Sequence, residues 1–306
     1  MSCPGFEPAQ LDWKEEVLRG GSLPRVELET GVNGWSSPPG NLFQVRGPNY
    51  LSKKQKISAG EWLLKPLGVD WLKSGSRLDD VLGRPDNRVM KAFKSANCLK
   101  NFVFAVNLQV PGREPHSAVF YFVAEDTIPA GSLLYRFINE DDNFRNARFK
   151  IVNRIVKGPW IVKATVGNYA ACLLGKALTC RYVRGPNYFE VDVDIGSSAL
   201  ASAILHLALG YVSSVTVDMA FLVEAQAEEE MPERIVGAVR ISQMEIGSAE
   251  RVGNITAGEE PEKVPPTEAA PAAGFQWSKL GKGLSLRKHG HHHGKVEAKK
   301  AEANCK

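Results

Sequence analysis

Residues 102–110 (FVFAVNLQV) and 118–124 (AVFYFVA) decide the fold of this chain. In the first run, Phe102, Phe104, Val106, Leu108 and Val110 alternate with the residues between them. This period of two puts five apolar side chains on one face of a strand. Pro111-Gly112 ends the run, and the second run follows closely. We therefore predict an antiparallel hairpin of two strands.

Comparable apolar runs on both sides of this hairpin predict a sheet of many strands. The further expected strands lie at 42–46, 133–138, 147–152, 160–166, 179–183, 188–195, 215–224 and 234–241. Residues 60–97 have a weak helical period instead. The side chains expected to point inward there are Trp62, Leu63, Leu67, Trp71 and Leu72.

One helix is clearly indicated. Ser197 or Ser198 can cap it, residues 199–209 are apolar almost all round except for His206, and Gly210 can end it. A helix that is apolar on every side is expected to be buried. The predicted fold class is thus α+β, a mainly antiparallel sheet packed with a few helices, including a buried helix at about 198–209. The regular alternation of strands and helices in a doubly wound fold is missing.

The composition, 43% apolar and 24% charged over 306 residues, is that of a globular protein with additional segments. We expect an N-terminal extension at 1–34 and one domain at 35–245. A linker rich in Pro, Ala and Glu is expected at 246–274. Residues 275–306 contain eight Lys or Arg, two Glu and four His, and they predict a basic disordered tail.

The five cysteines, an odd number without metal-ligand spacing, favour a reducing compartment. The first residues lack the basic leader and apolar core of a secretory signal. The apolar stretch 200–223 is interrupted by His206, Gly210 and Asp218, so it predicts protein core and not a membrane span. These features predict a cytoplasmic protein without a transmembrane segment, with peripheral membrane association as a further hypothesis.

The hexapeptide VRGPNY occurs twice, at 45–50 and at 183–188. Each copy has an Arg, a Gly-Pro-Asn turn and a Tyr that resumes regular structure. The repeated side chains are Arg46, Asn49 and Tyr50 in one copy and Arg184, Asn187 and Tyr188 in the other. The two copies are either equivalent corners of a pseudo-symmetric sheet or simply two good turns.

Residues 143–189 form a cationic block with nine basic residues and no Asp or Glu. The nine are Arg145, Arg148, Lys150, Arg154, Lys157, Lys163, Lys176, Arg181 and Arg184. One interpretation is that the flanking acidic clusters neutralise them within the fold. The other is a site for an anionic group such as a phosphate, which arginine can hold bidentately. For that site the candidates are Arg145, Arg148, Lys150, Arg154 and Lys163.

In the expected strand at 188–195, Tyr188, Glu190, Asp192 and Asp194 fall on one face and the apolar residues on the other. Three carboxylates in a row repel one another, so cations, a divalent metal or solvent must offset them. An ion-paired or solvated face is the simplest interpretation. A metal site and a catalytic carboxylate pair are the alternatives.

The sequence contains no recognisable catalytic, nucleotide-binding or zinc-protease motif. No zinc-finger spacing, helix-turn-helix pattern or paired RNA-binding motif is present, so a nucleic-acid partner is not expected. His206 lies in an apolar helix, where a hydrogen-bonded core residue is more common than a ligand. We predict no cofactor and no metal.

Several motifs together resemble one family. They are WSSP at 35–38, VDW at 69–71, VNLQVPG at 106–112, FRNARFK at 144–150, GPWIVK at 158–163, NYFEVDVDIGSS at 187–198, LGYV at 209–212, VDMA at 217–220 and MPERIVG at 231–237. They are similar to the C-terminal domain of the plant enhanced disease resistance two protein and its stand-alone relatives, over about 34–242. In longer relatives this domain follows a pleckstrin-homology and a START domain, which the first 34 residues here cannot hold. The family carries no assigned catalytic residues, so the resemblance transfers none.

The leading hypothesis is a non-enzymatic regulatory or binding module that recognises an anionic lipid in plant defence or cell-death-related signalling. A protein-interaction module, with Trp160 and the acidic segment 228–233 facing a partner, is the alternative. A metal-dependent enzyme using Asp192 and Asp194 is the third hypothesis.

Overall fold

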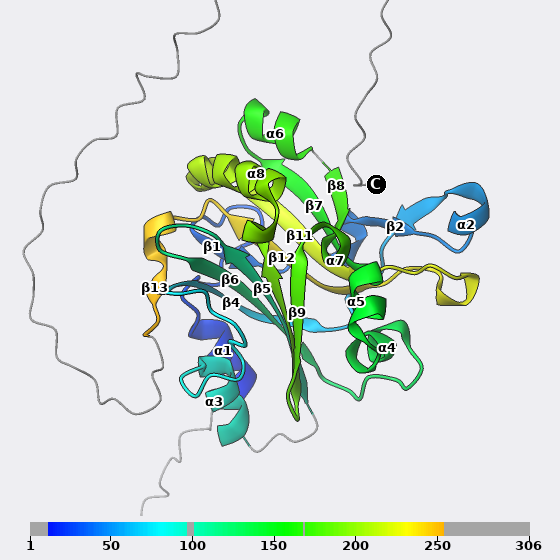
Figure 1. The fold of residues 1–306 in the computed structure, drawn as a ribbon, viewed down its shortest axis with the longest axis horizontal. Coiled ribbons are helices and arrows are strands. Elements are labelled where there is room, and N and C mark those ends of the chain that lie inside the picture. Colours follow the sequence, from blue (N-terminus) through cyan, green and yellow to red (C-terminus); the bar gives the residue numbers. More distant parts are fainter. Residues whose placement is uncertain (1–11, 97–100, 168, 254–306) are drawn as a thin grey trace, which may run out of the picture. The chain divides into compact units, whose positions relative to one another are not determined.

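The computed structural model describes residues 12–96, 101–167 and 169–253, which build two β-sheets around a shared core (Figure 1). The predicted tail and most of the predicted linker lie outside the described residues. The larger sheet has six strands in the order β13-β4-β6-β5-β10-β9. Their bounds are β4 (Lys65–Lys73), β5 (Phe102–Val110), β6 (His116–Ala124), β9 (Thr179–Arg184), β10 (Tyr188–Asp194) and β13 (Glu250–Arg251).

The predicted hairpin is confirmed as β5 and β6, which pair antiparallel from Phe102 opposite Ala124 to Val110 opposite His116. β10 runs parallel to β5 on the other side, and β13 runs parallel to β4 at the edge. The remaining pairs in this sheet are antiparallel. The predicted α+β class with a mainly antiparallel sheet is therefore confirmed. β13 also extends the folded part beyond the boundary expected at residue 245.

The second sheet has five strands in the order β1-β12-β11-β7-β8, all antiparallel. The strands are β1 (Gly34–Ser36), β7 (Phe149–Lys157), β8 (Tyr169–Leu173), β11 (Thr216–Val223) and β12 (Ile235–Ser242). A small ribbon, β2 (Gln44–Arg46) with β3 (Lys56–Ser58), packs Phe43, Val45 and Ala59 against the outer face of this sheet.

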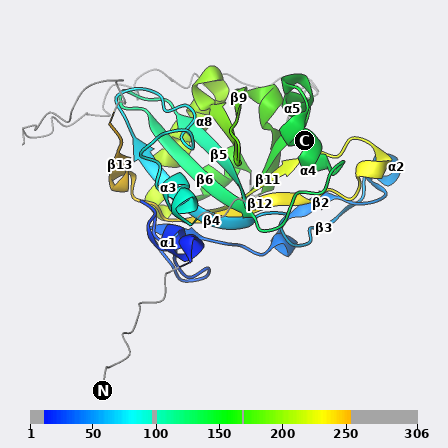
Figure 2. The same cartoon turned by 90° about the horizontal axis from the view of Figure 1, so that it is seen from below.

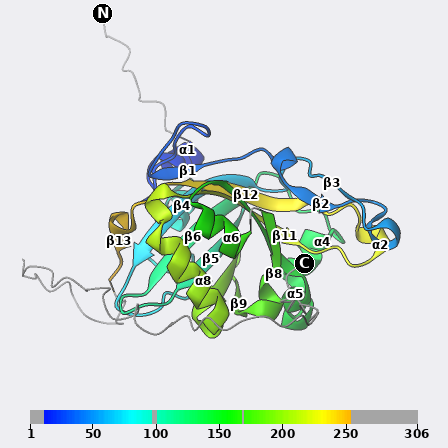
Figure 3. The same ribbon diagram turned by 90° about the horizontal axis from the view of Figure 1, so that it is seen from above.

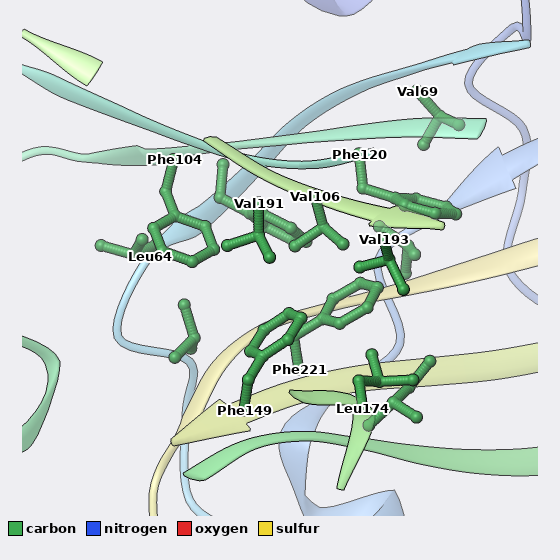
Figure 4. Close-up of a cluster of buried hydrophobic side chains, with 14 of the residues drawn as sticks. Leu64, Val69, Phe104, Val106, Phe120, Phe149, Leu174, Val191, Val193 and Phe221 are labelled. Carbon is green, nitrogen blue, oxygen red and sulfur yellow. The ribbon is translucent and has the colours of Figure 1, made fainter. Parts of the chain in front are cut away.

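Phenylalanine side chains from both sheets form the centre of the main core (Figure 4). Phe104 and Phe120 come from the six-stranded sheet, and Phe149 and Phe221 come from the five-stranded sheet. The rings of Phe120 and Phe221 are 5.6 Å apart between centroids, and those of Phe149 and Phe221 are 6.2 Å apart. Burial of this apolar area is the dominant stabilising contribution that holds the two sheets together.

Helices cover the sheets on their outer face and at their ends (Figure 2). α1 (Trp13–Arg19) and α3 (Arg88–Ser95) pack on the outer face of the six-stranded sheet, where Trp13 contacts Phe93 edge-on. α1 lies within the predicted N-terminal extension. The remaining helices are α2 (Tyr50–Lys53), α4 (Leu133–Asn139), α5 (Asp142–Arg148), α6 (Trp160–Val166), α7 (Leu174–Ala177) and α8 (Ala199–Gly210).

Two predicted strands are helices. Residues 133–138 form α4, whose first turn is capped by the Ser132 hydroxyl accepting from the Tyr135 N–H at 3.2 Å. Residues 160–166 form α6, which follows Pro159 and stops at Gly167 with φ of 88°. The period of a short apolar run does not distinguish a strand from a helix. In these two segments the flanking residues indicate the helix: Ser132 caps α4, and Pro159 and Gly167 bound α6.

The weak helical period at 60–97 was also misleading in its first half. Residues 65–73 are strand β4, buried on both faces because the core covers one side and α1 and α3 cover the other. Among the expected inward residues, Leu67, Trp71 and Leu72 are buried, whereas Trp62 and Leu63 are half-buried. A strand covered on both faces loses the alternation that identifies it.

The helix predicted at 198–209 exists as α8, and Ser198 caps it by accepting from the Ala201 N–H at 3.3 Å. The prediction that it is buried is wrong. Only Ala201, Leu205 and Leu209 pack against the main core, and Leu200 is 62% exposed. α8 lies against the side of the core and not inside it, so a single i, i+4, i+8 stripe is used.

Candidate functional site

The cationic block contributes to a buried ion-pair cluster between β2, β7 and the β11–β12 connection. Lys150 is buried and pairs with Glu233 and, at 3.5 Å, with Glu224. Arg46, from the first hexapeptide, pairs with Glu224 at 2.8 Å and donates to the Ala225 carbonyl. These charges are matched by partners inside the protein, so removing any one partner leaves a buried charge uncompensated.

Two further arginines of the block are equally engaged. Arg148 donates to Glu230 at 2.7 Å and to the Glu224 carbonyl at 2.9 Å. Arg154 donates at 2.6 Å to Asp218, a fully buried carboxylate that also accepts from Arg240. Each arginine therefore joins elements that are distant in the sequence.

Arg145 acts as a cap for α4. Its guanidinium donates to the carbonyls of Phe137 and Ile138, both at 2.9 Å, and pairs with Asp142 at 2.6 Å. It also lies over the ring of Phe189 at 5.2 Å. A cation at this position satisfies the last carbonyls of the helix and interacts favourably with its dipole.

The internal ion-pair interpretation of the cationic block therefore describes Arg145, Arg148, Lys150 and Arg154. The prediction that these four residues bind an external anion is therefore corrected, because each already has a carboxylate partner within the protein. Arg181 lies 3.7 Å from Asp79, and Arg184 donates to Asn139. Lys157, Lys163 and Lys176 keep side chains without an ion-pair or hydrogen-bond partner among the residues that the structure describes.

The carboxylate strand is β10, and the predicted assignment of its two faces is confirmed. Phe189, Val191 and Val193 enter the main core, whereas Glu190 and Asp192 lie on the opposite face. That face is neither solvated nor ion-paired at these two positions, because residues 78–83 cover it. Glu190 accepts from the backbone N–H groups of Val81 at 2.8 Å and Leu82 at 2.7 Å.

Asp192 completes this arrangement by accepting from the Asp80 N–H at 3.1 Å and from the Asn107 amide at 2.8 Å. Burial raises the pKa of Glu190 well above its usual value of 4.5, and the adjacent charge of Asp192 raises it further. Burial likewise raises the pKa of Asp192. Two buried carboxyls that hydrogen-bond to each other favour a state with one shared proton.

The outer end of the strand behaves differently. Asp194 pairs with Arg77 at 2.9 Å, as the ion-paired interpretation predicted, and Tyr188 donates to Asp80 at 3.0 Å. Within the described ranges, no group of three or more His, Cys, Asp or Glu side chains could hold a metal ion. Asp192 holds the 78–83 loop through the hydrogen bond that it accepts from the Asp80 N–H.

The two hexapeptide copies are not equivalent corners. In the first copy Asn49 precedes α2 and Tyr50 begins that helix, with the Arg46 guanidinium 4.7 Å from the Tyr50 ring centroid. In the second copy the turn joins β9 to β10, with the Gly185 N–H donating to the Tyr188 carbonyl and Asn187 accepting from the Val103 N–H. The identical turns therefore lead into different elements.

A surface formed by α6 and α8, called here the α6–α8 surface, contains exposed apolar side chains, among them Leu200, which the sequence interpretation had placed in a buried helix. The two helices pack against each other (Figures 1 and 3). Trp160 is 78% exposed and Leu200 is 62% exposed. His206, also predicted as a core residue, is exposed and contacts the Ser202 carbonyl at 2.7 Å.

Unpaired positive charge accompanies these apolar side chains. Lys163 lies on α6, and Lys157 ends β7 three residues before Trp160. Neither 143–189 nor 195–217 contains an acidic residue, and the preceding carboxylate, Asp194, is occupied by Arg77. The signal was therefore present in the sequence as two acid-free stretches, but their juxtaposition required the tertiary structure.

Within the described ranges, no helix has both the length and the apolar character that a bilayer span requires. Within the described residues Cys172 and Cys180 form no disulfide bond, and burial raises the pKa of Cys180 to about 12. Such a thiol stays protonated at neutral pH and is a poor nucleophile.

The sequence of this chain is similar to those of known proteins. The family model described as "Protein ENHANCED DISEASE RESISTANCE 2, C-terminal" matches residues 35–245. A relative from Arabidopsis thaliana, "Protein ENHANCED DISEASE RESISTANCE 2-like", is 45% identical over 229 residues, which cover 75% of this chain and 31% of that protein. The chain thus spans less than a third of the length of this relative, and no solved structure matches. On these matches, the chain belongs to the family of the ENHANCED DISEASE RESISTANCE 2 C-terminal domain.

Proposed function

We propose that this domain is a non-enzymatic binding module that attaches to anionic membrane surfaces through the α6–α8 surface. The name of its relative supports a role connected with plant disease resistance. One observation carries the binding proposal: Trp160 and Leu200 are exposed on two packed helices beside lysines that lack partners.

The chemistry of this surface complements that of an anionic lipid headgroup region. Tryptophan prefers the membrane interface, where its ring meets apolar chains and its N–H meets polar groups. Lys157 and Lys163 each supply about 1 kcal/mol of attraction near an anionic surface. Because the surrounding segments lack carboxylates, this attraction is not cancelled locally. The surface is thus suited to peripheral binding, with Lys163 as the one residue retained from the candidate anion-binding set.

Vesicle flotation of the full chain tests the proposal. We expect flotation with phosphatidylcholine vesicles that contain phosphatidic acid and none with phosphatidylcholine alone. The double variant Lys157→Ala/Lys163→Ala should bind roughly tenfold or more weakly, from two lysines at about 1 kcal/mol each. The pair Trp160→Ala/Leu200→Ser should also lose binding, because the apolar contribution is gone.

A matched control for the lysine variant exists on α3, on the outer face of the six-stranded sheet. Lys91→Ala/Lys94→Ala removes two exposed lysines there. This control should float like the unmodified chain. The basic tail is present in every variant, so its contribution is constant. Equal flotation of the lysine variant and its control would refute the α6–α8 surface as the binding site.

A protein partner is the second candidate, and the exposure of Trp160 is again the observation that favours it, since tryptophan is enriched at binding hot spots. The acidic segment 228–233 contributes less than expected, because Glu230 and Glu233 are engaged in internal ion pairs. Pull-down from plant extract with the unmodified chain and the Trp160→Ala variant tests this alternative. A partner recovered by both to the same extent would exclude a role for Trp160.

A further inference from the structure

A cavity of about 600 Å³ opens at the end of the two sheets that is remote from α6. Its wall consists of the residues before and at the start of β4, the β6–α4 connection with the first turn of α4, and the β11–β12 connection with its cis Met231–Pro232 bond. Strands β7 and β11 connect the two ends: Thr216 is opposite Lys157 near α6, and Val223 is opposite Phe149 near the cavity. The two places are roughly 23 Å apart along β11 at about 3.3 Å per residue.

We propose that this cavity is a binding site for a small, largely apolar molecule without net charge. Its floor consists of the buried side chains of Leu64, Leu134, Val223 and Val236, which belong to the main core. A ligand there would thus contact the same apolar layer that joins the sheets. Pockets that hold small molecules commonly have volumes of roughly 300–1,000 Å³ and mostly apolar walls.

The half-buried residues at the entrance extend this apolar lining. Leu63, Ile128 and Leu133 line the cavity and pack against the main core without being fully covered. Apolar surface of this kind gains free energy when a ligand displaces water from it. The cavity is therefore more favourable for an apolar molecule than for a hydrated ion.

The charges at the rim support an uncharged ligand. Glu125 is paired with Lys65 and with Lys14, and Glu230 is paired with Arg136 and Arg148. Hydrogen bonds from Lys65 and Lys14 lower the pKa of Glu125. Burial opposes a low pKa at Glu230, but hydrogen bonds from the Gln226 N–H and from Arg148 lower it, so both carboxyls stay ionised.

The remaining rim charges do not favour an anionic ligand. Arg234, Asp126 and Glu229 line the cavity and have no ion-pair partner among the described residues. One cation and two anions give no preference for an anionic ligand, in contrast to the α6–α8 surface. The two sites thus differ in chemistry as well as in position.

Fluorescence titration with Nile red, an uncharged apolar dye, tests this site in the absence of vesicles. We expect saturable binding of one dye per chain. Leu133→Trp should weaken binding by at least about tenfold, or 1.4 kcal/mol, because the larger side chain fills the cavity from α4. Val32→Trp, at an exposed residue that does not line the cavity, is the matched control and should leave binding unchanged.

Amide chemical shifts recorded on the unmodified chain provide a readout that does not depend on variants. Dye added to the protein should move the signals of Val223, Val236 and Leu134 and leave those of α6 and α8 in place. If Leu133→Trp fails to fold, Ile128→Trp replaces it at the same entrance. Absence of saturable binding, or shifts confined to α6 and α8, would overturn the proposal. Neither outcome bears on vesicle flotation, so the two sites can fail separately.

Discussion

Arg240 on β12 donates to Asp218 on the neighbouring strand β11 at 2.6 Å, and the two side chains are 3% and 0% exposed. Arg154 from β7 donates to the same carboxylate at 2.6 Å. One buried anion thus joins three adjacent strands of the five-stranded sheet. Asp218 neutralises the buried charges of both Arg154 and Arg240.

Replacing Asp218 by Ala should therefore destabilise the domain strongly. Loss of one partner from a buried ion pair costs about 3–5 kcal/mol, because the remaining charge is left uncompensated. Urea unfolding measured by circular dichroism gives the difference in the free energy of unfolding. Asp194→Ala is the control, since Asp194 pairs with Arg77 near the surface and should cost about 1 kcal/mol or less. Equal effects at the two sites would contradict the buried-pair interpretation.

The buried carboxyls of β10 predict a dependence of stability on pH. The pKa of Glu190 is raised in the folded state, so above its unfolded value of 4.5 the folded protein binds more protons than the unfolded chain. This contribution to stability is full below pH 4.5 and is lost as pH rises toward the folded pKa. The free energy of unfolding should fall by up to about 1.4 kcal/mol per pH unit for one proton.

Asp192→Asn tests the origin of this slope. The substitution removes the neighbouring charge that raises the pKa of Glu190, so the fall in stability above pH 4.5 should become shallower. Unfolding free energies from urea titrations at several pH values measure it. Asp194→Asn, on the same face but paired with Arg77, should retain the slope of the unmodified chain. A variant slope identical to that of the unmodified chain would contradict the assignment of this pH dependence to the Glu190–Asp192 pair.

Gly237 on β12 is required by close packing between the sheets. A Cβ atom at this position would lie 2.2 Å from the ring of Phe122, which belongs to the six-stranded sheet. Gly237→Ala should therefore destabilise the domain by about 1–3 kcal/mol through overpacking. Gly247→Ala is the control, because nothing lies within 4 Å of a Cβ added there. Thermal unfolding of both variants measures the effect, and a neutral Gly237→Ala would argue against this tight contact.

Trp160 should report directly on membrane contact. Its exposed ring should pass from water to the lipid interface when anionic vesicles are added, which shifts its emission to shorter wavelength. Subtracting the response of the Trp160→Phe variant removes the contribution of the other tryptophans. The shift should decline as salt is added, because screening weakens the attraction of Lys157 and Lys163 to the anionic surface. A response that persists unchanged in Trp160→Phe would place the lipid contact elsewhere.

Local sequence patterns correctly predicted some of the helices and strands. The β5–β6 hairpin, the two faces of β10 and the bounds of α8 follow from period, turn residues and caps within a few positions. Predictions failed where the environment changes the pattern. β4 is covered on both faces and loses its alternation, whereas α4 and α6 are too short for a helical period to appear.

The sequence by itself determined the family, the α+β class and the segregation of charge into acid-free and acidic stretches. Only the tertiary structure decided which of the basic side chains remain available to bind an external anion. Lys150 meets Glu233 from 83 residues away, and Arg154 meets Asp218 from 64 residues away. Lys157 and Lys163 meet no carboxylate among the described residues. The physical reason is that a period records which side chains of one element share a face, whereas neutralisation of a charge depends on which distant element packs against that face.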